Sequence, residues 1–195
     1  MRRAYRISVA AATLVLGVLA LAALGLMLLL VTGTVKIYSV GSSTMEPTLH
    51  CARPTPGCDA TRKDRLFVLT RFVSYGRGDI VTFEPPPKAE AVCRTAVAYV
   101  KRIIGLPGES VEIRIRNRAA IVYVGGRMLA EPYVVQNRRG SGPEKTFTVP
   151  QDHYFVMGDD RLRSCDSRLW GAVPRENLIG KVFMIYWPPQ RISFP

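Results

Sequence analysis

The chain of 195 residues carries 27 Lys and Arg against 15 Asp and Glu, which gives it a net charge of +12 at pH 7. An excess of this size is compatible with binding to nucleic acid or to an anionic membrane surface. The basic residues are scattered, however, and neither a run of five basic residues nor a helix-turn-helix or aromatic–basic RNA motif is visible. The composition therefore argues against a nucleic-acid-binding protein.

The N-terminal segment contains the strongest apolar signal. An uncharged stretch rich in Leu, Ala and Val covers residues 7–31, long enough to cross the hydrocarbon core of a bilayer as a helix. A cleaved secretory signal is the alternative, but its apolar core is usually about 7–15 residues long, and this stretch is well beyond that. The sequence therefore predicts a transmembrane anchor, with the lipid bilayer as a partner.

The charges beside this stretch predict its orientation. Three Arg residues precede it, whereas Lys36 is the single basic residue among the twenty that follow. The positive-inside bias therefore assigns residues 1–6 to the cytoplasm. Residues 32–195 are then an extracytoplasmic domain on the outer face of the plasma membrane, held by a single span.

This outer part is predicted to be one mainly β domain. Short β-type runs are separated by turn residues, and long stretches of helical period do not appear in its sequence. Gly125-Gly126 predicts a hairpin turn. The predicted strands cover residues 66–72, 80–83, 99–104, 111–115, 121–124, 154–157 and 182–186.

The outer part also contains all four cysteines, in a compartment whose oxidising chemistry permits disulfides. They are Cys51, Cys58, Cys93 and Cys165. An even number is typical of paired cysteines. A zinc site is the alternative, but no two of these cysteines have C-x-x-C spacing, and the chain offers two further ligands of the usual kind, His50 and His153. We expect neither a metal nor a cofactor.

Two segments combine residues suited to nucleophilic chemistry. Residues 41–49 form a hydroxyl cluster with a turn-forming Pro, a pattern also typical of ordinary loops. Residues 99–108 place Lys101 in an apolar β run, on the same face as Tyr99 and Ile103. Burial penalises the ammonium form, and the pKa of a free Lys, about 10.4, has to fall by several units before the amine accepts a proton near neutral pH. The alternative is an edge-strand Lys that points into water.

A third segment, residues 158–171, combines acidic, hydroxyl and Arg residues between glycines. Asp166 and Arg168 are spaced to form a charge-assisted pair that fixes the loop. Calcium binding is disfavoured because the segment lacks the ligand spacing of an EF-hand. A Ser-His-Asp triad is disfavoured as well, since Asp152 and His153 are neighbours, and neighbouring strand residues point to opposite faces.

These segments occur in the order and wording of bacterial type I signal peptidases. The hydroxyl block, which ends in Met45-Glu46-Pro47-Thr48-Leu49, resembles the nucleophile motif Ser-Met-x-Pro-Thr-Leu. Residues 77–81 (Arg-Gly-Asp-Ile-Val) resemble the second motif, residues 99–108 the Lys motif, and residues 158–171 the motif Gly-Asp-x-Arg … Ser-x-Asp-Ser-Arg. The resemblance implies a mainly antiparallel β domain with an apolar surface near the membrane. It also implies an endopeptidase that removes signal peptides from exported preproteins.

In that family a Ser hydroxyl attacks the scissile carbonyl while a neutral Lys takes its proton. By resemblance Lys101 is the base, and the hydroxyl of Ser164 holds its amine. Asp166 and Arg168 match residues that shape the supporting loop. Ser42 matches a hydroxyl that assists the N–H of the nucleophile itself in stabilising the oxyanion.

The chain departs from the family pattern at the nucleophile. In a gapless alignment the residue before Met45 is Thr44 rather than Ser. Its β-methyl group restricts χ1 and crowds the approach to a carbonyl. Three interpretations stay open: Thr44 attacks, Ser43 attacks and Thr44 is an insertion, or activity is weak or lost. The gapless alignment keeps Ser42 in register and therefore favours Thr44.

The same register predicts shallow substrate pockets that accept small side chains such as Ala before the cut. The corresponding residues are Val40, Met45, Leu49, Tyr99 and Val100. The alternative is that they belong to the ordinary core.

The resemblance also suggests how the cysteines pair. Because the Lys and the second Ser of the site must meet, we expect a bridge between the nearby Cys93 and Cys165. Cys51 and Cys58 are then expected to close a short loop.

Two other functions stay open at this point. One is a catalytically silent, membrane-anchored binding module that keeps the fold, suggested by Thr44. The other is a processing peptidase dedicated to one substrate, such as a conjugation or pilus protein. In each case we expect a monomer.

Overall fold

The computed structural model describes residues 2–93, 98–140 and 144–195, with side chains from residue 9 onwards. The chain divides into two compact units, residues 1–36 and residues 37–195. The Arg side chains that predict the orientation of the N-terminus lie outside the described residues.

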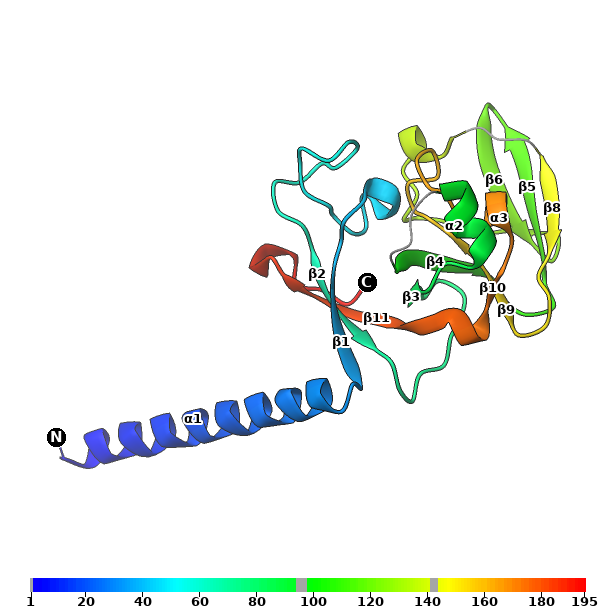
Figure 1. Ribbon diagram of the computed structural model, residues 1–195. Coiled ribbons are helices and arrows are strands. Elements are labelled where there is room, and N and C mark those ends of the chain that lie inside the picture. The colour runs from blue at the N-terminus through cyan, green and yellow to red at the C-terminus, as the bar shows by residue number, and fades with distance from the viewer. Residues whose placement is uncertain (1, 94–97, 141–143) are drawn as a thin grey trace. The chain divides into compact units, whose positions relative to one another are not determined.

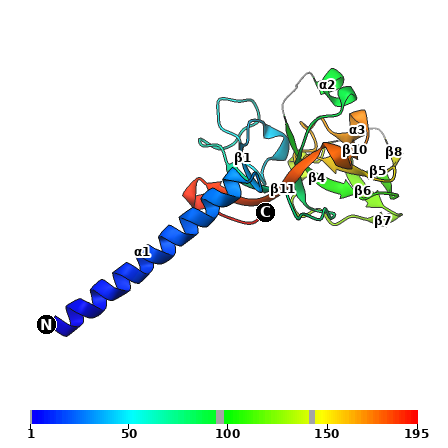
Figure 2. The ribbon, with the colours of Figure 1, turned by 60° about the horizontal axis from the view of Figure 1, so that its bottom comes forward.

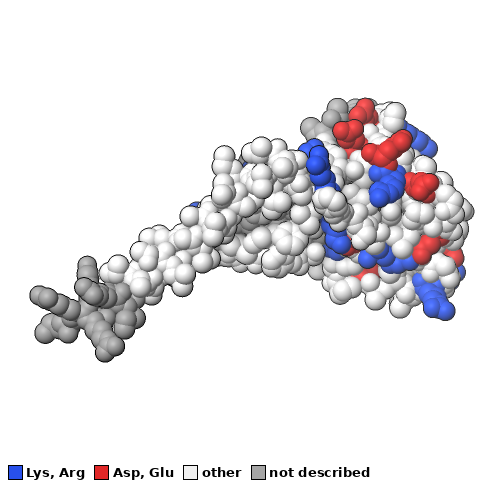
Figure 3. All heavy atoms as spheres, turned by 90° about the horizontal axis from the view of Figure 1, so that it is seen from below, with Lys and Arg blue, Asp and Glu red and all other residues white. Residues whose placement is uncertain are grey.

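The first unit consists mainly of helix α1, Arg2–Val31. Its segment Val9–Val31 has a mean hydropathy of 3.0 and is long and apolar enough to cross a membrane. Figure 3 shows the described part of this helix as a surface of uncharged residues. Leu, Ala and Val at nearly every position leave no polar face, so the helix is apolar all round, as a membrane span requires.

Within the described residues of the second unit, the larger sheet has seven strands in the order β1-β2-β11-β3-β4-β9-β10. Figure 1 shows β11 between β2 and β3, and β4 on the inner side of the sheet next to β9. The strands are β1 Val35–Ser39, β2 Arg65–Leu69, β3 Ile80–Phe83, β4 Tyr99–Gly105, β9 His153–Met157, β10 Val173–Pro174 and β11 Leu178–Trp187.

A four-stranded sheet in the order β7-β6-β5-β8 accounts for the other described strands. It is an antiparallel meander whose β5 alternates between buried and partly exposed residues, so one face covers the core. The turned view in Figure 2 shows β5 and β6 side by side with β7 at the edge. The strands are β5 Ser110–Arg116, β6 Ala119–Val124, β7 Arg127–Met128 and β8 Lys145–Thr148.

Short helices and two disulfides connect the sheets. The bridges join Cys51 to Cys58 and Cys93 to Cys165, the two pairs expected from the sequence. The second bridge ties the end of α2 to the loop before α3. The helical elements of the domain are η1 Ser43–Met45, α2 Pro87–Cys93, η2 Gln136–Arg138, α3 Ser167–Trp170, η3 Arg175–Asn177 and η4 Pro189–Arg191.

The prediction of a mainly antiparallel β domain behind an apolar helix is confirmed. Each predicted strand is present, with ends that differ by a few residues, and the hairpin turn lies at Gly125 and Gly126, whose φ angles are 55° and 76°. Strands β1, β7, β8 and β10 were missed, as were α2 and α3. These elements are short, with at most seven residues, so the periodicity of their sequences carries little signal.

Candidate active site

The hydroxyl cluster becomes a tight turn directly after β1. Ser42 has an extended backbone, with φ −139° and ψ 158°, and the 3-10 helix η1 begins at Ser43. Because such a helix turns by about 120° per residue, successive side chains point in different directions. The turn therefore separates three neighbouring hydroxyls, which the sequence alone could not rank.

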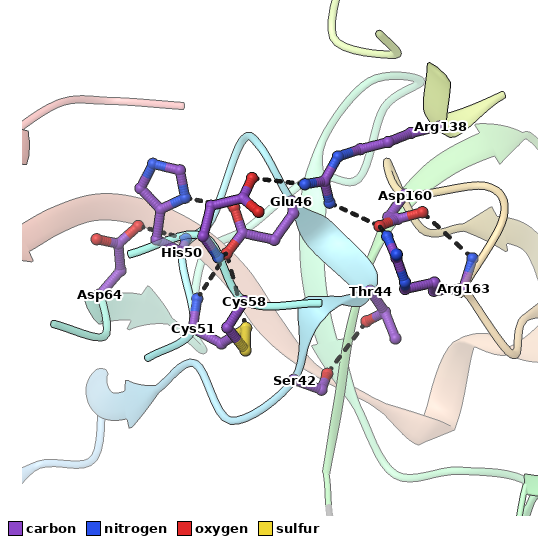
Figure 4. Close-up of a disulfide and its surroundings, with 11 residues drawn as sticks. Ser42, Thr44, Glu46, His50, Cys51, Cys58, Asp64, Arg138, Asp160 and Arg163 are labelled. Carbon is purple, nitrogen blue, oxygen red and sulfur yellow. Dashed lines mark hydrogen bonds and ion pairs between the residues drawn. A yellow bond between two sulfur atoms is a disulfide. The ribbon is translucent and has the colours of Figure 1, made fainter. Parts of the chain in front are cut away.

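Thr44 is the residue of this cluster whose hydroxyl meets the Lys. Its Oγ1 lies 2.7 Å from Nζ of Lys101 and 3.3 Å from Oγ of Ser42. The second contact is drawn in Figure 4. A distance of 2.7 Å allows direct proton transfer between the amine and the hydroxyl.

Ser43 lies in a different environment. Its side chain is buried, and a Cβ atom added at Gly57 would lie 2.7 Å from Ser43 Oγ. Ser43 thus faces the loop closed by the Cys51–Cys58 bridge. Within the described residues, the hydrogen bond of Lys101 Nζ goes to Thr44 and not to Ser43.

Lys101 lies on β4, which is paired with β3 on one side and β9 on the other. The residue is 4% exposed, and Nζ lies 5.5 Å from the ring centroid of Tyr99, as expected for side chains on one strand face. Burial lowers the pKa of Lys101 from 10.5 to about 8, although the carboxylates of Asp166 and Asp159 act in the opposite direction. A useful fraction of the amine is therefore neutral at mildly alkaline pH.

The loop after β9 braces this pair. The N–H of Gly158 donates to Asp166 Oδ2 at 3.0 Å and to Ser164 Oγ at 3.1 Å. Arg168 pairs with Asp166 through Nε and Nη2, at 2.8 and 2.9 Å, and Nη2 also donates to two loop carbonyls. Burial raises the pKa of Asp166, but Arg168 and the hydrogen bonds outweigh it, so the pKa is lowered and the carboxyl stays ionised.

Ser164 does not hold the Lys amine in this structure. We expected its hydroxyl to contact Lys101, but within the described residues its hydrogen bonds go to Gly158 and Asp166. The competing donor is a backbone N–H, which is buried and needs an acceptor. The sequence pattern contains no information on this competition.

Gly158 is the point where the loop touches the nucleophile turn. A Cβ atom there would collide with the carbonyl oxygen of Thr44 and with Ser164 Oγ. Two residues later, the N–H of Asp160 donates to the same carbonyl oxygen of Thr44 at 3.1 Å. The glycine therefore permits the close approach that fixes Thr44 from its backbone side.

The residues expected to line the substrate pockets are near the dyad but also belong to the core. Met45 and Leu49 are buried to 1% and 0% exposure, and Val100 packs against the same cluster as Val40. Tyr99 is part of a second cluster together with Ile103. Both interpretations of these residues, pocket lining and core, are therefore compatible with the structure.

The two histidines take no part in this arrangement. Nδ1 of His50 contacts the carboxylate of Glu46, and Nδ1 of His153 lies 2.8 Å from the carbonyl oxygen of Gln151. The part of the chain that the structure describes holds no group of three His, Cys, Asp or Glu side chains that could bind a metal ion.

Three residues near the site were not singled out from the sequence: Glu46, Arg138 and Asp160. Glu46 occupies the variable position of the nucleophile motif, and Asp160 stands inside the third segment. The carboxylates of both are fully buried. Because a buried carboxylate needs partners, an acidic residue beside the apolar Met45 was a signal that could have identified Glu46.

The fold and the site define a class of protein: an antiparallel β domain that follows an apolar helix and buries a hydroxyl–lysine pair. The family model described as signal peptidase, peptidase S26, matches residues 13–187. The chain belongs to this family.

Individual relatives agree with the family assignment. The chain is 40% identical over 160 residues to a probable signal peptidase I-2 of Synechocystis, an alignment that covers 79% of this chain and 64% of the relative. It is 34% identical over 166 residues to a signal peptidase I of Bacillus licheniformis, covering 77% and 76%. This chain thus spans just under two thirds of the Synechocystis protein. A crystal structure of a signal peptidase I from Enterococcus faecalis is 33% identical, with a TM-score of 0.44, and covers 56% of this chain and 97% of that one.

Proposed function

We propose that this protein is a membrane-anchored endopeptidase that removes N-terminal signal peptides from exported preproteins after small residues. Thr44 is its nucleophile and Lys101 its general base. The observation that carries the proposal is the 2.7 Å contact between Thr44 Oγ1 and a buried Lys101 Nζ whose pKa is lowered to about 8. Family membership supports the same reaction class.

The reaction follows from this contact. Neutral Lys101 takes the proton of the Thr44 hydroxyl while Oγ1 attacks the carbonyl carbon of the scissile bond. The resulting ammonium then gives that proton to the leaving amine, and the acyl group stays on Oγ1 as an ester. A water molecule, activated by the neutral amine in the same way, hydrolyses the ester and restores the hydroxyl.

The tetrahedral intermediate of each step carries a negative oxygen that needs hydrogen-bond donors. The N–H of Thr44 and the hydroxyl of Ser42 are the proposed donors, and the proximity of the Ser42 and Thr44 hydroxyls supports this role. Ser164, Asp166 and Arg168 are proposed to hold the loop that braces Lys101.

The substrate is proposed to lie with its small residues over shallow apolar depressions. The side chains assigned to them are Val40, Met45, Leu49, Tyr99 and Val100. Met45 and Leu49 are already packed into the core, which leaves shallow rather than deep space beside Thr44 and supports a preference for residues such as Ala. A larger side chain would have to displace core atoms.

The apolar helix is proposed to be a single plasma-membrane span, with residues 1–6 in the cytoplasm, residues 7–31 in the bilayer and residues 32–195 outside. The hydropathy of Val9–Val31 supports this arrangement. The protein is proposed to act as a monomer on preproteins that reach the same membrane face.

A mutant series on the full-length protein in detergent, with a signal-peptide substrate, tests the nucleophile. Thr44→Ala is expected to lower kcat by at least ~10³-fold, because the attacking oxygen is lost. Thr44→Ser is expected to preserve or increase kcat, since it removes the crowding methyl group and keeps the hydroxyl. Ser43→Ala is expected to matter little, and Thr146→Ala, on the exposed strand β8, is the matched control.

The opposite pattern, with Ser43→Ala fatal and Thr44→Ala active, would transfer the role of nucleophile to Ser43. An inert wild type beside an active Thr44→Ser variant would identify a silent homologue disabled by one methyl group. Cleavage of a single preprotein out of a broad panel would indicate a dedicated processing peptidase. Activity that survives the loss of both hydroxyls would end the proposal.

A further inference from the structure

The loop closed by Cys51 and Cys58 is attached to the nucleophile turn through a buried carboxylate. Glu46, two residues after Thr44, is 0% exposed. Its Oε1 accepts the N–H of Cys51 at 3.2 Å and that of Asp59 at 3.4 Å, one at each end of the loop. Its Oε2 contacts Nδ1 of His50. Figure 4 shows Glu46 directed toward the bridge and His50, away from Thr44.

The loop also packs directly on the turn. At Gly57, where φ is +82°, an added Cβ would lie 2.7 Å from Ser43 Oγ and 2.9 Å from Cδ of Arg163. The bridge spans a sequence separation of seven residues, so it holds Gly57 close to Ser43. Ser43 is the residue before Thr44, and a shift of this loop would therefore move the nucleophile.

A second attachment runs through Asp160. Its N–H holds the carbonyl oxygen of Thr44. Its carboxylate accepts from Nη1 of Arg138 at 2.6 Å and from Nη1 of Arg163 at 3.2 Å, as Figure 4 shows. Arg138 donates in addition to the carboxylate of Asp59, the residue directly after Cys58.

The contacts form a closed path around the nucleophile: from Thr44 through Glu46 to the loop, from Asp59 through Arg138 to Asp160, and back to Thr44. Each carboxylate on the inner side of the path is fully buried, so water does not replace a lost contact. Such a path restricts the turn more than any single bond in it.

We infer that the Cys51–Cys58 loop and Glu46 are positioning elements that hold the hydroxyl of Thr44 at proton-transfer distance from Lys101. This inference rests on the proposed function. A nucleophile displaced by about 1 Å loses on the order of 10²-fold in rate, because the reacting atoms leave their near-attack geometry. The loop does not contribute to the apolar surroundings of Lys101, so its loss changes the rate and not the titration of the base.

Four variants of the full-length protein in detergent test the inference. Cys51→Ser combined with Cys58→Ser opens the loop, and Glu46→Leu removes the acceptor but keeps the size of the side chain. Glu46→Gln keeps one oxygen for the two N–H groups. Glu109→Gln is the control, since Glu109 also pairs with an Arg and accepts a backbone N–H, but lies in the turn before β5.

The opened loop and Glu46→Leu are each expected to lower kcat per folded molecule about 10- to 100-fold, with KM changed less than about threefold and the midpoint of the pH profile unchanged. Glu46→Gln should recover most of the rate, and Glu109→Gln should match the wild type. Activities are normalised to the folded fraction from near-UV circular dichroism, so that loss of folded protein is not counted as loss of positioning.

Amide hydrogen exchange of residues 42–50 is measured on the same samples, because it does not depend on activity. Faster exchange of this segment, with unchanged exchange in β5 and β6, is expected for the first two variants. If the wild type cleaves nothing but the segment loosens, the proposed function fails and the positioning role stands. If kcat and exchange both stay at wild-type values in these variants, or if exchange rises equally throughout the domain, the inference is overturned.

Discussion

The two faces of strand β4 treat a buried cation in opposite ways. Arg102 donates from Nε and Nη2 to the carboxylate of Asp159, at 2.9 and 2.7 Å, and its guanidinium lies 4.1 Å from the ring centroid of Tyr133. Lys101, the preceding residue, has no carboxylate within ion-pair distance among the described residues, and its amine meets the hydroxyl of Thr44.

The difference shows what separates a structural cation from a reactive one. A bidentate pair compensates the guanidinium for lost hydration, so Arg102 remains charged and holds two segments together. The ammonium of Lys101 lacks that compensation, and its pKa falls to about 8. Burial is similar, at 4% for Lys101 and 7% for Arg102, so the partner and not the depth decides the role.

The largest expected effect comes from removing the reactive cation. Lys101→Met should lower kcat at least ~10³-fold, because no base remains for the hydroxyl. Below pH 8 the folded protein also no longer buries a poorly compensated ammonium, so the free energy of unfolding should stay equal or rise by ~1–3 kcal/mol. A peptide-cleavage assay and urea denaturation at pH 7 measure the two effects.

Lys181→Met is the control for this variant, because Lys181 lies on β11 in an ion pair with Asp79, at 2.7 Å. It should cleave at the wild-type rate. A Lys101→Met protein that processes a preprotein normally would remove the distinction between the two faces.

The structural cation should give the reverse result. Arg102→Met leaves the carboxylate of Asp159 buried without its ion pair, and we expect a loss of about 3–5 kcal/mol in the free energy of unfolding. Urea denaturation of both variants side by side measures the contrast. Arg114→Met, in an exposed pair with Glu112 on the four-stranded sheet, should leave the denaturation midpoint unchanged. Equal stabilities for Arg102→Met and Lys101→Met would contradict the comparison.

The smallest effect expected is the dependence of the wild type on pH. Since Lys101 is the base and its pKa is about 8, roughly a tenth of the amine is neutral at pH 7 and roughly nine tenths at pH 9. The value of kcat/KM should therefore rise nearly tenfold over this interval, with a midpoint near 8. Initial rates in buffers of constant ionic strength measure it, and a flat profile from pH 6 to 9 would be incompatible with a neutral Lys101.

The sequence by itself determined the features that depend on local pattern. The uncharged run of 7–31 predicted an apolar helix, and strand alternation put Lys101 on the face of Tyr99, where the structure has it. The spacing of the cysteines gave the same two pairs that the structure contains. These features depend on neighbours along the chain or on motif order, and both can be read from one sequence.

Only the tertiary structure decided which hydroxyl meets the Lys. Thr44 and Ser43 are adjacent, and the direction of each side chain is set by η1 and by a loop that returns Gly57 to Ser43. The partners of Glu46 and Asp160 come from segments up to 22 residues or more away, as in the Arg138–Asp160 pair, so no local pattern reports them. The lowered pKa of Lys101 belongs to the same group of features, because desolvation is produced by all the segments that close over a residue and not by its neighbours in sequence.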